Sequence, residues 1–437
     1  MNTRIGIRLE DKNAWERRTP LIPAHVKTLQ EQHGIEVYVQ SSPLRAFSEE
    51  EYAQAGATIV PELSACPVIF AIKEIPPEVL EPHKTYIFFS HTIKGQKHSM
   101  PMLQRLLELG CQLIDYERIV NETGRRIIFF GNYAGLAGMT DTLWALGQRL
   151  AVEGLETPFS DIRQTLQYAD LAAVKAAVRE AGQRIATEGL PVSLTPLVCG
   201  FAGYGNVSRG AQEIYDLLPV IEIAPEDLAD LDDHNPHHVY KVIFKEQDMV
   251  EPRAPGATFA LQDYYDHPEK YRARFEQYLP HLTVLLNAIY WTERYPRLVT
   301  KRALQTLFSQ SQRPCLRVIG DVSCDIEGAI ECNVRATDPG NPIYVYNPRT
   351  GQTRDGYHGE GVVVLAVDNL PCELPIESST HFSNTLLPFV PELARADYNT
   401  PFEQCNLSPL LKRAVIVWQG ELTPDYRYLA QFLPPDS

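Results

Sequence analysis

The sequence predicts an α/β protein of two domains, each Rossmann-like with a parallel sheet. Its 437 residues exceed what one hydrophobic core normally organises. Short apolar runs alternate with helical patterns, which is typical of parallel sheets covered by helices. A glycine-rich turn, VCGFAGYGNVSRG at 198–210, joins one apolar run to a helical pattern. These observations together predict a dinucleotide-binding fold beside a second α/β domain.

Composition narrows the class of protein. Hydrophobic residues make up 44% and charged residues 22%, and no apolar run approaches the ~18 residues that a membrane helix needs. The formal net charge of −15 repels nucleic acid and anionic membranes. The N-terminus is charged where a secretory signal would be apolar, so we expect a cytoplasmic protein. The eight cysteines form no C-x-x-C pair, so we expect neither a metal knuckle nor a disulfide framework.

The first part of the chain predicts a parallel sheet with polar residues at its strand ends. The expected strands are 4–9, 36–40, 68–73, 85–90, 112–118 and 125–131, and the expected helices are 21–34, which Gly34 ends, and 102–110. Residues 131–154 are rich in small residues and then amphipathic, which predicts a long helix leaving the first domain and acting as a hinge.

The second part predicts the dinucleotide-binding domain. A helix at 169–182 precedes the glycine turn, and the short strand VIEI (220–223) follows it. The polar, aromatic stretch 230–300 is interpreted as a partly helical insert. Further strands are expected at 317–325, 343–347 and 362–371, and a helix starts near Glu377. The predicted domains are a substrate domain, 1–140 completed by 345–437, and a dinucleotide-binding domain, 141–344 with its insert at 230–300.

The glycine turn has the chemistry of a pyrophosphate site. Glycines permit positive φ and close backbone approach, and the unpaired N–H groups of the following helix attract an anion. The spacing departs from G-x-G-x-x-G, because Ser208 stands at the third glycine's place. A tight turn that merely packs a helix on a strand is the alternative. The residues predicted to bind the dinucleotide are Gly200, Gly203, Gly205, Asn206, Val207 and Gly210.

Two strand ends carry groups suited to proton transfer. Lys73 closes the run VIFAIK and His91 closes TYIFFSH, so two groups of different basicity can face one edge of the sheet. The alternative is that both are exposed strand-end residues. Arg18 and Arg126 are candidates for binding carboxylates in a two-pronged manner, although an arginine taken alone is more often a surface residue.

Acidic residues also follow two of the expected strands. Asp115 and Glu117 face the same side if the strand continues through them, and such an acid would raise the pKa of a neighbouring lysine or histidine. Asp321 and Asp325 end another strand and could either contact a substrate amine or cap a helix. His234, His237 and His238 are interpreted as residues of a solvated loop.

Several phrases carry a family resemblance. They are AWERRTPLIPAHVK, IKEIPPE, FFSHTIKGQ, IDYERIVNETGRRIIFFGNYAGLAG, GYGNVSRGAQ, DHPEKYRARF, LLNAIYWTERYPRLVT and VLAVDNLPCELPIESS. The chain resembles the lysine–2-oxoglutarate reductase domain of the bifunctional aminoadipic semialdehyde synthases over nearly its whole length. Lysine-forming saccharopine dehydrogenases, alanine dehydrogenase and transhydrogenase are more distant relatives. The resemblance implies the fold of this alanine dehydrogenase/saccharopine dehydrogenase type.

The resemblance also implies roles for matching residues. Lys73 and His91 correspond to an acid/base pair, and Arg18 and Arg126 to arginines that hold substrate carboxylates. Glu117 corresponds to an acid that tunes the lysine. Asp321 lies in a DVS phrase near substrate and nicotinamide.

The implied activity is the NADPH-dependent condensation and reduction of L-lysine and 2-oxoglutarate to saccharopine in lysine degradation. Ala224 follows VIEI where an NAD site usually has an acid, which favours NADPH over NAD unless Glu222 or Glu226 reaches the ribose. A homo-oligomer or a separate saccharopine dehydrogenase is the expected protein partner, since the chain ends where that half would begin. The alternatives are another opine-type or amino-acid dehydrogenase, or a cofactor-binding sensor without turnover.

Overall fold

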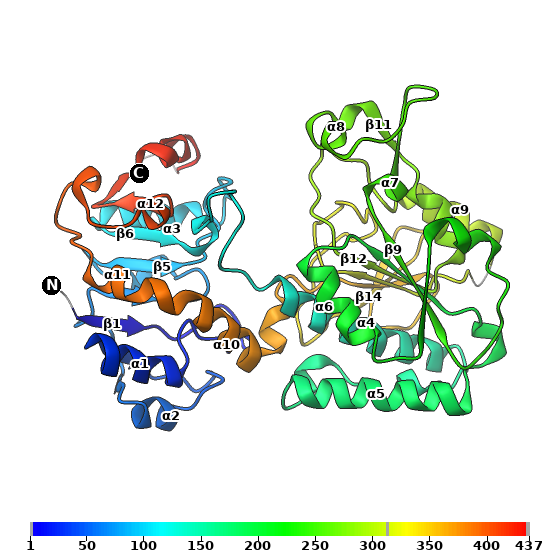
Figure 1. Cartoon of the computed structure of the whole chain (residues 1–437), viewed down its shortest axis with the longest axis horizontal. Helices are drawn as coiled ribbons and strands as arrows, with labels where there is room; N and C mark the ends of the chain where they lie inside the picture. The colour runs from blue at the N-terminus through cyan, green and yellow to red at the C-terminus, as the bar shows by residue number, and fades with distance from the viewer. Residues whose placement is uncertain (1–2, 312–313, 434–437) are drawn as a thin grey trace. The chain divides into compact units, whose positions relative to one another are not determined.

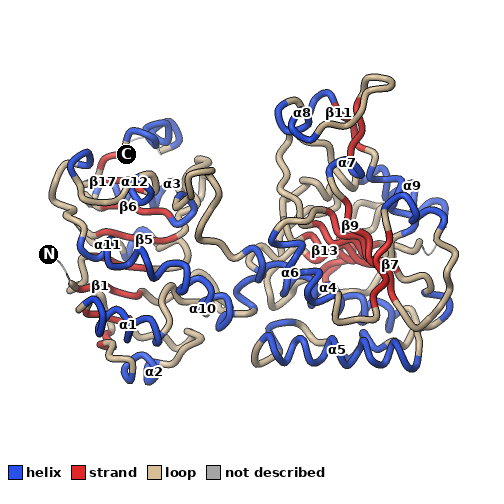
Figure 2. Tube along the Cα trace, viewed as in Figure 1, coloured by secondary structure: helices blue, strands red, loops and turns tan. Residues whose placement is uncertain are grey.

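The computed structural model describes residues 3–311 and 314–433, which fall into two compact units. Unit 1 comprises Met1–Phe130 and Pro375–Ser437, and unit 2 comprises Gly131–Leu374. Each unit has an α/β architecture with a mostly parallel sheet, so the predicted fold class is confirmed (Figures 1 and 2). The boundaries differ from the expected ones. Residues 345–374 belong to unit 2, because the strands they form pair with its sheet.

The sheet of unit 1 has the strand order β18-β17-β6-β5-β4-β1-β2-β3 among its described residues. Its strands are β1 Arg4–Ile7, β2 Glu36–Gln40, β3 Thr58–Val60, β4 Val68–Phe70, β5 Thr85–Phe88, β6 Gln112–Asp115, β17 Val415–Trp418 and β18 Glu421–Leu422. The strands β1 to β6 pair in parallel, whereas β17 joins β6 antiparallel. The carboxyl ends of β1, β4, β5 and β6 therefore lie next to one another at one edge.

The helices of unit 1 come from both parts of the chain. They are α1 Pro23–His33, α2 Glu49–Gln54, α3 Met100–Glu108, α10 Pro375–Leu386, α11 Val390–Arg395 and α12 Pro409–Lys412. Two serines of α10 tie it to the segment before α1, since Thr19 N–H donates to Ser379 Oγ and Ile22 N–H to Ser383 Oγ, both at 3.0 Å. Figure 1 shows α10 and α11 in orange beside the blue α1. The C-terminal segment thus completes the core of unit 1.

Unit 2 holds a second sheet with the strand order β15-β14-β16-β13-β12-β7-β9-β8. Its strands are β7 Val198–Ala202, β8 Val220–Ile223, β9 Val239–Phe244, β12 Val284–Asn287, β13 Val318–Asp321, β14 Ile343–Tyr346, β15 Thr353–Asp355 and β16 Val362–Leu365, and a separate hairpin pairs β10 Val250–Pro252 with β11 Tyr271–Ala273. The helices are α4 Gly131–Val152, α5 Leu171–Glu188, α6 Asn206–Tyr215, α7 Glu246–Met249, α8 Leu261–Asp266 and α9 Lys301–Gln310.

Two expected elements are wrong. The run 125–131 is not a strand: it has one bridge, between Val120 and Arg126, and buries Ile128 in the core as irregular chain. The stretch 230–300 is not one insert, because β9 and β12 within it flank β7 in the sheet. Both strands are short and apolar, and the polar segments on either side of them led to the prediction of a single insert. The true excursion runs between them, and its aromatic residues, Tyr264 and Phe275 among them, pack in one hydrophobic cluster with sheet residues such as Phe244.

Candidate functional site

The predicted chemistry-bearing residues of unit 1 gather at the carboxyl edge of its sheet. Lys73 lies three residues beyond β4 and His91 three residues beyond β5, and these strands are neighbours. Glu117 follows β6 in the same way, and Arg18 lies in the long connection after β1. Open α/β sheets bind ligands at this edge, because the connecting loops place their side chains there.

His91 is held by a carboxylate that the sequence reasoning missed. Its Nδ1 lies 2.5 Å from Glu74 Oε1, and Lys12 Nζ lies 3.1 Å from Glu74 Oε2. Burial alone would raise the pKa of Glu74, but the hydrogen bond and charge of His91, with Lys12 and Lys73, hold that pKa well below its usual range. The backbone of His91 has a φ of 49°, which is uncommon outside glycine and found often at functional sites. Glu74 therefore fixes the ring and leaves Nε2 as the nitrogen that can exchange a proton.

Lys73 is half-buried beside this pair. Burial lowers its pKa, and the nearby positive charges of Arg18 and Lys12 lower it further against the opposing effect of Glu74. A buried acid, Glu10, positions the backbone here: its carboxylate accepts from Ile72 N–H at 2.6 Å and from Lys73 N–H at 3.0 Å. Lys73 is thus easier to deprotonate than a surface lysine, as a proton acceptor requires.

Arg18 is buried and tightly oriented. Its Nε and Nη2 lie 2.8 and 2.5 Å from the two oxygens of Glu16, and its guanidinium lies 4.3 Å from the ring centroid of Phe130. The planar fork of arginine allows both contacts at once. Its charge lowers the pKa of Lys73, and Glu16 is a partner that the sequence reasoning did not identify.

Arg126 and Glu117 form an ion pair with each other. The Arg126 side chain is 52% exposed, so water screens its charge more strongly than that of the buried Arg18. The expectation that Asp115 and Glu117 face the same side of a strand is wrong, because β6 ends at Asp115 and a 3-10 turn follows. Burial raises the pKa of Asp115 to about 6 while Ser90 and the Glu117 N–H bind it. The largest influences on the pKa of Lys73 are its burial and the charges of Arg18, Lys12, Glu74 and Glu16.

The glycine turn of unit 2 connects β7 to α6. Gly203 has a φ of 96°, and its N–H donates to Phe244 O at 3.0 Å. A Cβ there would lie 3.0 Å from Ile289, whereas a Cβ on Gly205 would meet open space. Asn206 and Val207 form the first turn of α6, where backbone N–H groups lack helical partners. Strand, turn and helix thus follow one another as a dinucleotide site requires.

Two of the predicted cofactor glycines serve packing. Gly200 lies inside β7, and a Cβ on it would contact Phe244 and Leu282. Gly210 is buried in α6, where a Cβ would lie 2.1 Å from Asn132 O of α4. The backbone of the turn itself comes from Gly203 to Val207.

The strand order changes which residues stand beside the glycine turn. The prediction placed the ribose-binding position at Ala224, after β8. In the sheet, however, β8 is the edge strand and β9 pairs directly with β7. Lys245 and Glu246 follow β9, so they, and not Ala224, stand next to the glycine turn. Chain order suggested the wrong neighbour because the first crossover after β7 skips one strand position.

A pocket of about 420 Å³ opens beside the turn. Tyr265 O–H donates to Glu246 Oε1 at 2.6 Å within it. Burial, together with the charge and hydrogen bond of Glu246, raises the pKa of Tyr204. The described residues that line this pocket are Gly203, Tyr204, Gly205, Glu246, Met249, Val250, Tyr264, Tyr265, Ala288, Ile289, Tyr290, Tyr295, Pro296 and Leu298.

Asp321 ends β13 and is fully buried. Its two carboxylate oxygens accept from Asn287 Nδ2 at 2.8 Å and from Asn333 Nδ2 at 2.7 Å. Burial raises its pKa to about 6 against these hydrogen bonds. Asp321 thus joins the end of β12 to the loop after β13, which is the geometry of a positioning residue.

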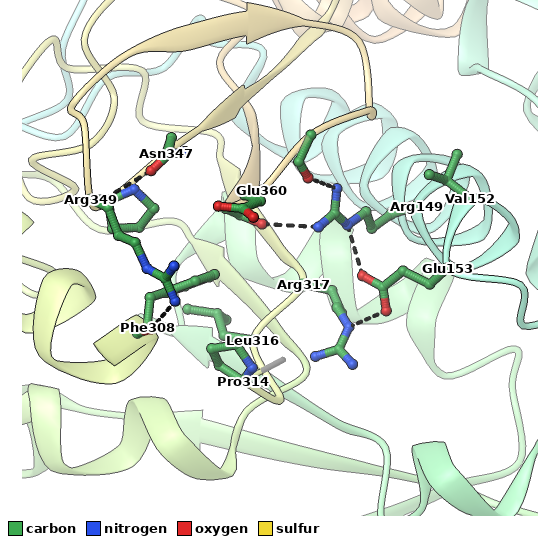
Figure 3. A pocket seen from close by; sticks show the side chains of 13 residues that line it. Arg149, Val152, Glu153, Phe308, Pro314, Leu316, Arg317, Asn347, Arg349 and Glu360 are labelled. Atoms are coloured by element: carbon green, nitrogen blue, oxygen red, sulfur yellow. Dashed lines mark hydrogen bonds and ion pairs between the residues drawn. The ribbon is translucent and has the colours of Figure 1, made fainter. Parts of the chain in front are cut away.

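A second pocket of unit 2 lies at the opposite edge of the sheet (Figure 3). Glu153 bridges Arg149 and Arg317, with both Nε–O distances at 2.9 Å. Arg149 also donates to the backbone oxygens of Tyr357 and Gly359. Because these residues precede β13 and β16, the network holds the amino ends of the strands and lies away from the glycine turn.

Comparison with known proteins identifies the family. The alanine dehydrogenase/PNT N-terminal domain matches residues 6–137, and the alanine dehydrogenase/PNT C-terminal domain matches residues 217–425. The chain belongs to the alanine dehydrogenase/PNT family. L-alanine dehydrogenase shares its fold, with a TM-score of 0.62 and 19% identity over 98% of this chain and 99% of that one. A transhydrogenase from Sinorhizobium meliloti has a TM-score of 0.56 and 14% sequence identity, over 96% of this chain and 100% of its own. The family comprises oxidoreductases that bind nicotinamide cofactors.

Sequence relatives within the family confirm the resemblance seen in the motifs. The alpha-aminoadipic semialdehyde synthase of Arabidopsis thaliana is 41% identical over 97% of this chain and 41% of its own length. The corresponding mitochondrial protein of Bos taurus is 36% identical over 97% and 47%. The chain spans less than half the length of these two relatives. A saccharopine dehydrogenase [NAD(+), L-lysine-forming] of Emericella nidulans is 28% identical over 90% of this chain and 92% of its own length.

The described part of the chain lacks two other kinds of site. Within 3–311 and 314–433, no helix is both long and apolar enough to cross a membrane. Over the same ranges, no three histidine, cysteine or acidic side chains gather as metal ligands would. His238 instead contacts Asp233 and Tyr240.

Proposed function

We propose that this chain is a lysine–2-oxoglutarate reductase, which condenses L-lysine with 2-oxoglutarate and reduces the product to saccharopine in lysine degradation. The observation that carries the proposal is the presence of Lys73, His91 and Arg18 at one sheet edge, each oriented by its own carboxylate or backbone contact. Relatives at 36–41% identity are named alpha-aminoadipic semialdehyde synthase, which supports the lysine pathway.

The chemistry needs two proton-transfer groups of different pKa. The ε-amine of lysine attacks the ketone only when it is neutral, and the resulting hydroxyl leaves as water only when it is protonated. Lys73, with its lowered pKa, can take up a proton at Nζ. His91, held at Nδ1 by Glu74, can give or accept one at Nε2. The nicotinamide, when bound, supplies the hydride that reduces the imine carbon.

Carboxylate recognition falls to the two arginines. 2-Oxoglutarate brings two negative charges to a protein of net charge −15, so local cations must offset the cost of removing them from water. We assign this role to Arg18 and Arg126. Glu117 then holds Arg126 in place, and Asp321 positions the loop after β13 in unit 2.

The cofactor binds, in this proposal, on the backbone of Gly203, Gly205, Asn206 and Val207. The expected preference for NADPH rested on Ala224, and the strand order removes that reason. The fungal relative is named as an NAD(+) enzyme. Location in the cytoplasm and a protein partner, either a second copy or a separate saccharopine dehydrogenase, remain predictions, and the cattle relative is named as mitochondrial.

The test is oxidation of NADH and of NADPH by the full chain, followed at 340 nm. L-lysine with 2-oxoglutarate should support turnover, and product analysis should give saccharopine. Replacement of 2-oxoglutarate by pyruvate should lower the rate strongly, because the second carboxylate is then missing. Equal rates with pyruvate would favour the runner-up, another amino-acid or opine-type dehydrogenase. Nucleotide binding without turnover on any amine and keto acid would favour a sensor.

A further inference from the structure

His91 lies in the loop between β5 and α3, and buried groups fix the residues on either side of it. Ser90 N–H donates to Asp115 Oδ2 at 3.1 Å, and the Ser90 hydroxyl also binds Asp115. Ser90 Oγ lies 2.8 Å from Thr92 Oγ1. Ser90, Thr92 and Asp115 are all buried. These contacts tie the start of the loop to the end of β6.

The turn that follows His91 is less embedded. Gly95 N–H donates to Thr92 O at 2.8 Å, which closes the turn 92–95, and Gly95 has a φ of 65°. Ile93 and Gly95 are half-buried, and Lys94 is exposed. Loops with few core contacts are the parts of a protein that open most easily, so this turn needs a further support.

The C-terminal part of the chain supplies that support. It forms the 3-10 segment η12, Pro424–Phe432, which belongs to the same unit and is drawn in red in Figure 1. Tyr428 O–H donates to Ile93 O at 2.6 Å. The ring of Phe432 covers Gly95 so closely that a Cβ on Gly95 would lie 2.5 Å from the ring. Two side chains of η12 therefore hold the turn 92–95.

The segment η12 is itself firmly anchored. Tyr426 and Leu429 are buried in the core of unit 1. Tyr426 O–H donates to Arg413 O at 2.6 Å, and its hydroxyl accepts from Arg118 Nε at 2.8 Å. Arg118 lies in the turn after β6. The segment thus contacts the loops that follow two neighbouring strands, β5 and β6.

We propose that Tyr428 is a positioning residue for His91, and that it acts by holding the turn 92–95 through Ile93 O. The φ of 49° at His91 is uncommon outside glycine, and such a conformation persists only where the surrounding structure enforces it. Glu74 fixes the ring at Nδ1, whereas Tyr428 fixes the backbone that carries the ring. The inference rests on the proposed function in taking His91 as a proton-transfer group.

The experiment is a double-mutant cycle on kcat, with the full chain, L-lysine, 2-oxoglutarate and the nicotinamide nucleotide. Tyr428→Phe removes one hydroxyl from a side chain that is 45% exposed, so the fold should be retained. We expect kcat to fall about 5-fold, which corresponds to one hydrogen bond, while the KM for the nucleotide stays unchanged. In a His91→Gln background the same substitution should lower kcat no further, because the ring that Tyr428 positions is absent.

A matched control comes from another tyrosine of unit 1. Tyr398 O–H donates to Leu393 O at 2.7 Å, so Tyr398→Phe removes the same kind of bond away from the His91 loop. This variant should keep the kcat of the unmodified chain. Amide hydrogen exchange of the free chain then tests the contact without the reaction. Residues 92–96 should exchange about 5-fold faster in Tyr428→Phe and at the unmodified rate in Tyr398→Phe.

Unchanged kcat in Tyr428→Phe would overturn the inference, and so would an equal loss of kcat with and without His91. Unchanged hydrogen exchange at 92–96 would overturn it as well. If the unmodified chain does not turn over lysine and 2-oxoglutarate, the proposed reaction fails. The exchange measurement then decides by itself whether Tyr428 holds the loop of His91.

Discussion

The carboxyl edges of the two sheets carry different kinds of residue. The edge of unit 1 is crowded with titratable side chains: Glu74 holds His91, Glu16 holds Arg18, and the buried acid Glu10 holds the backbone of Lys73. The described lining of the pocket beside the glycine turn of unit 2 consists of glycine, tyrosine and apolar residues with one carboxylate, Glu246. Proton transfer and carboxylate binding need tuned charges, whereas a dinucleotide needs free backbone and flat apolar contact. The comparison therefore predicts that substitutions at the two edges affect different kinetic constants.

The largest effect should come from the acid/base pair of unit 1. Lys73→Met and His91→Gln should each lower kcat by about 10²-fold or more, because proton transfer is lost, while NADH binding stays within a factor of about two. Steady-state rates and cofactor titrations measure both quantities. The exposed neighbours supply matched controls, since Lys97→Met and His98→Gln should behave like the unmodified chain. Normal rates in both site variants would remove the pair from the mechanism.

The glycine turn of unit 2 should respond in the opposite way. Gly205→Val should weaken nucleotide binding by about 10-fold or more, because its side chain would occupy the approach of the pyrophosphate. The position has an ordinary φ and open space around it, so the fold should be retained. Gly203→Val should also lose binding, but the φ of 96° adds backbone strain. A folded Gly205→Val variant with unchanged affinity for both nucleotides would show that they bind elsewhere.

Arginine geometry in unit 1 gives a smaller effect. Arg18→Lys keeps the charge but loses the two-pronged contact with Glu16, so the KM for 2-oxoglutarate should rise by about 10-fold while the KM for the nucleotide changes little. Arg126→Lys should have a weaker effect, since that side chain is half exposed. Arg105→Lys on the surface of α3 is the control. A rise confined to the nucleotide KM would assign Arg18 to the cofactor instead.

The smallest effect concerns stability and pH. Burial, reinforced by the charge of Glu16, raises the pKa of Glu10 to about 8. The folded state therefore holds a proton that the unfolded state releases above pH 4.5, so the stabilisation is complete below that pH and is lost as the pH rises toward about 8. The free energy of unfolding, measured with urea, should fall between pH 5 and pH 8. This fall should be smaller for Glu10→Gln than for the unmodified chain, by about 1 kcal/mol or more. The control Glu50→Gln, at an exposed position, should show the same fall in the free energy of unfolding as the unmodified chain. An equal fall in Glu10→Gln would refute the role assigned to Glu10.

Sequence alone determined the features that depend on local pattern. Apolar runs of strand length, glycines at fixed spacing and polar residues directly after strands follow from backbone geometry that neighbouring residues impose. They located the α/β class, the turn at 203–207, and the strand ends that carry Lys73 and His91. The motif phrases added the family, because they preserve residues over nearly the whole chain.

Tertiary structure alone decided which of these local pieces are neighbours. Strand order depends on crossovers, and no local pattern showed that β9, and not β8, lies beside β7. This choice places Glu246, and not Ala224, beside the glycine turn. The partners Glu10 and Glu74 were likewise invisible in the pattern, since a carboxylate's role depends on what packs within hydrogen-bond distance across the sheet. Hydrogen bonds act over a few ångströms in space, whereas the residues they join can be separated by any length of chain.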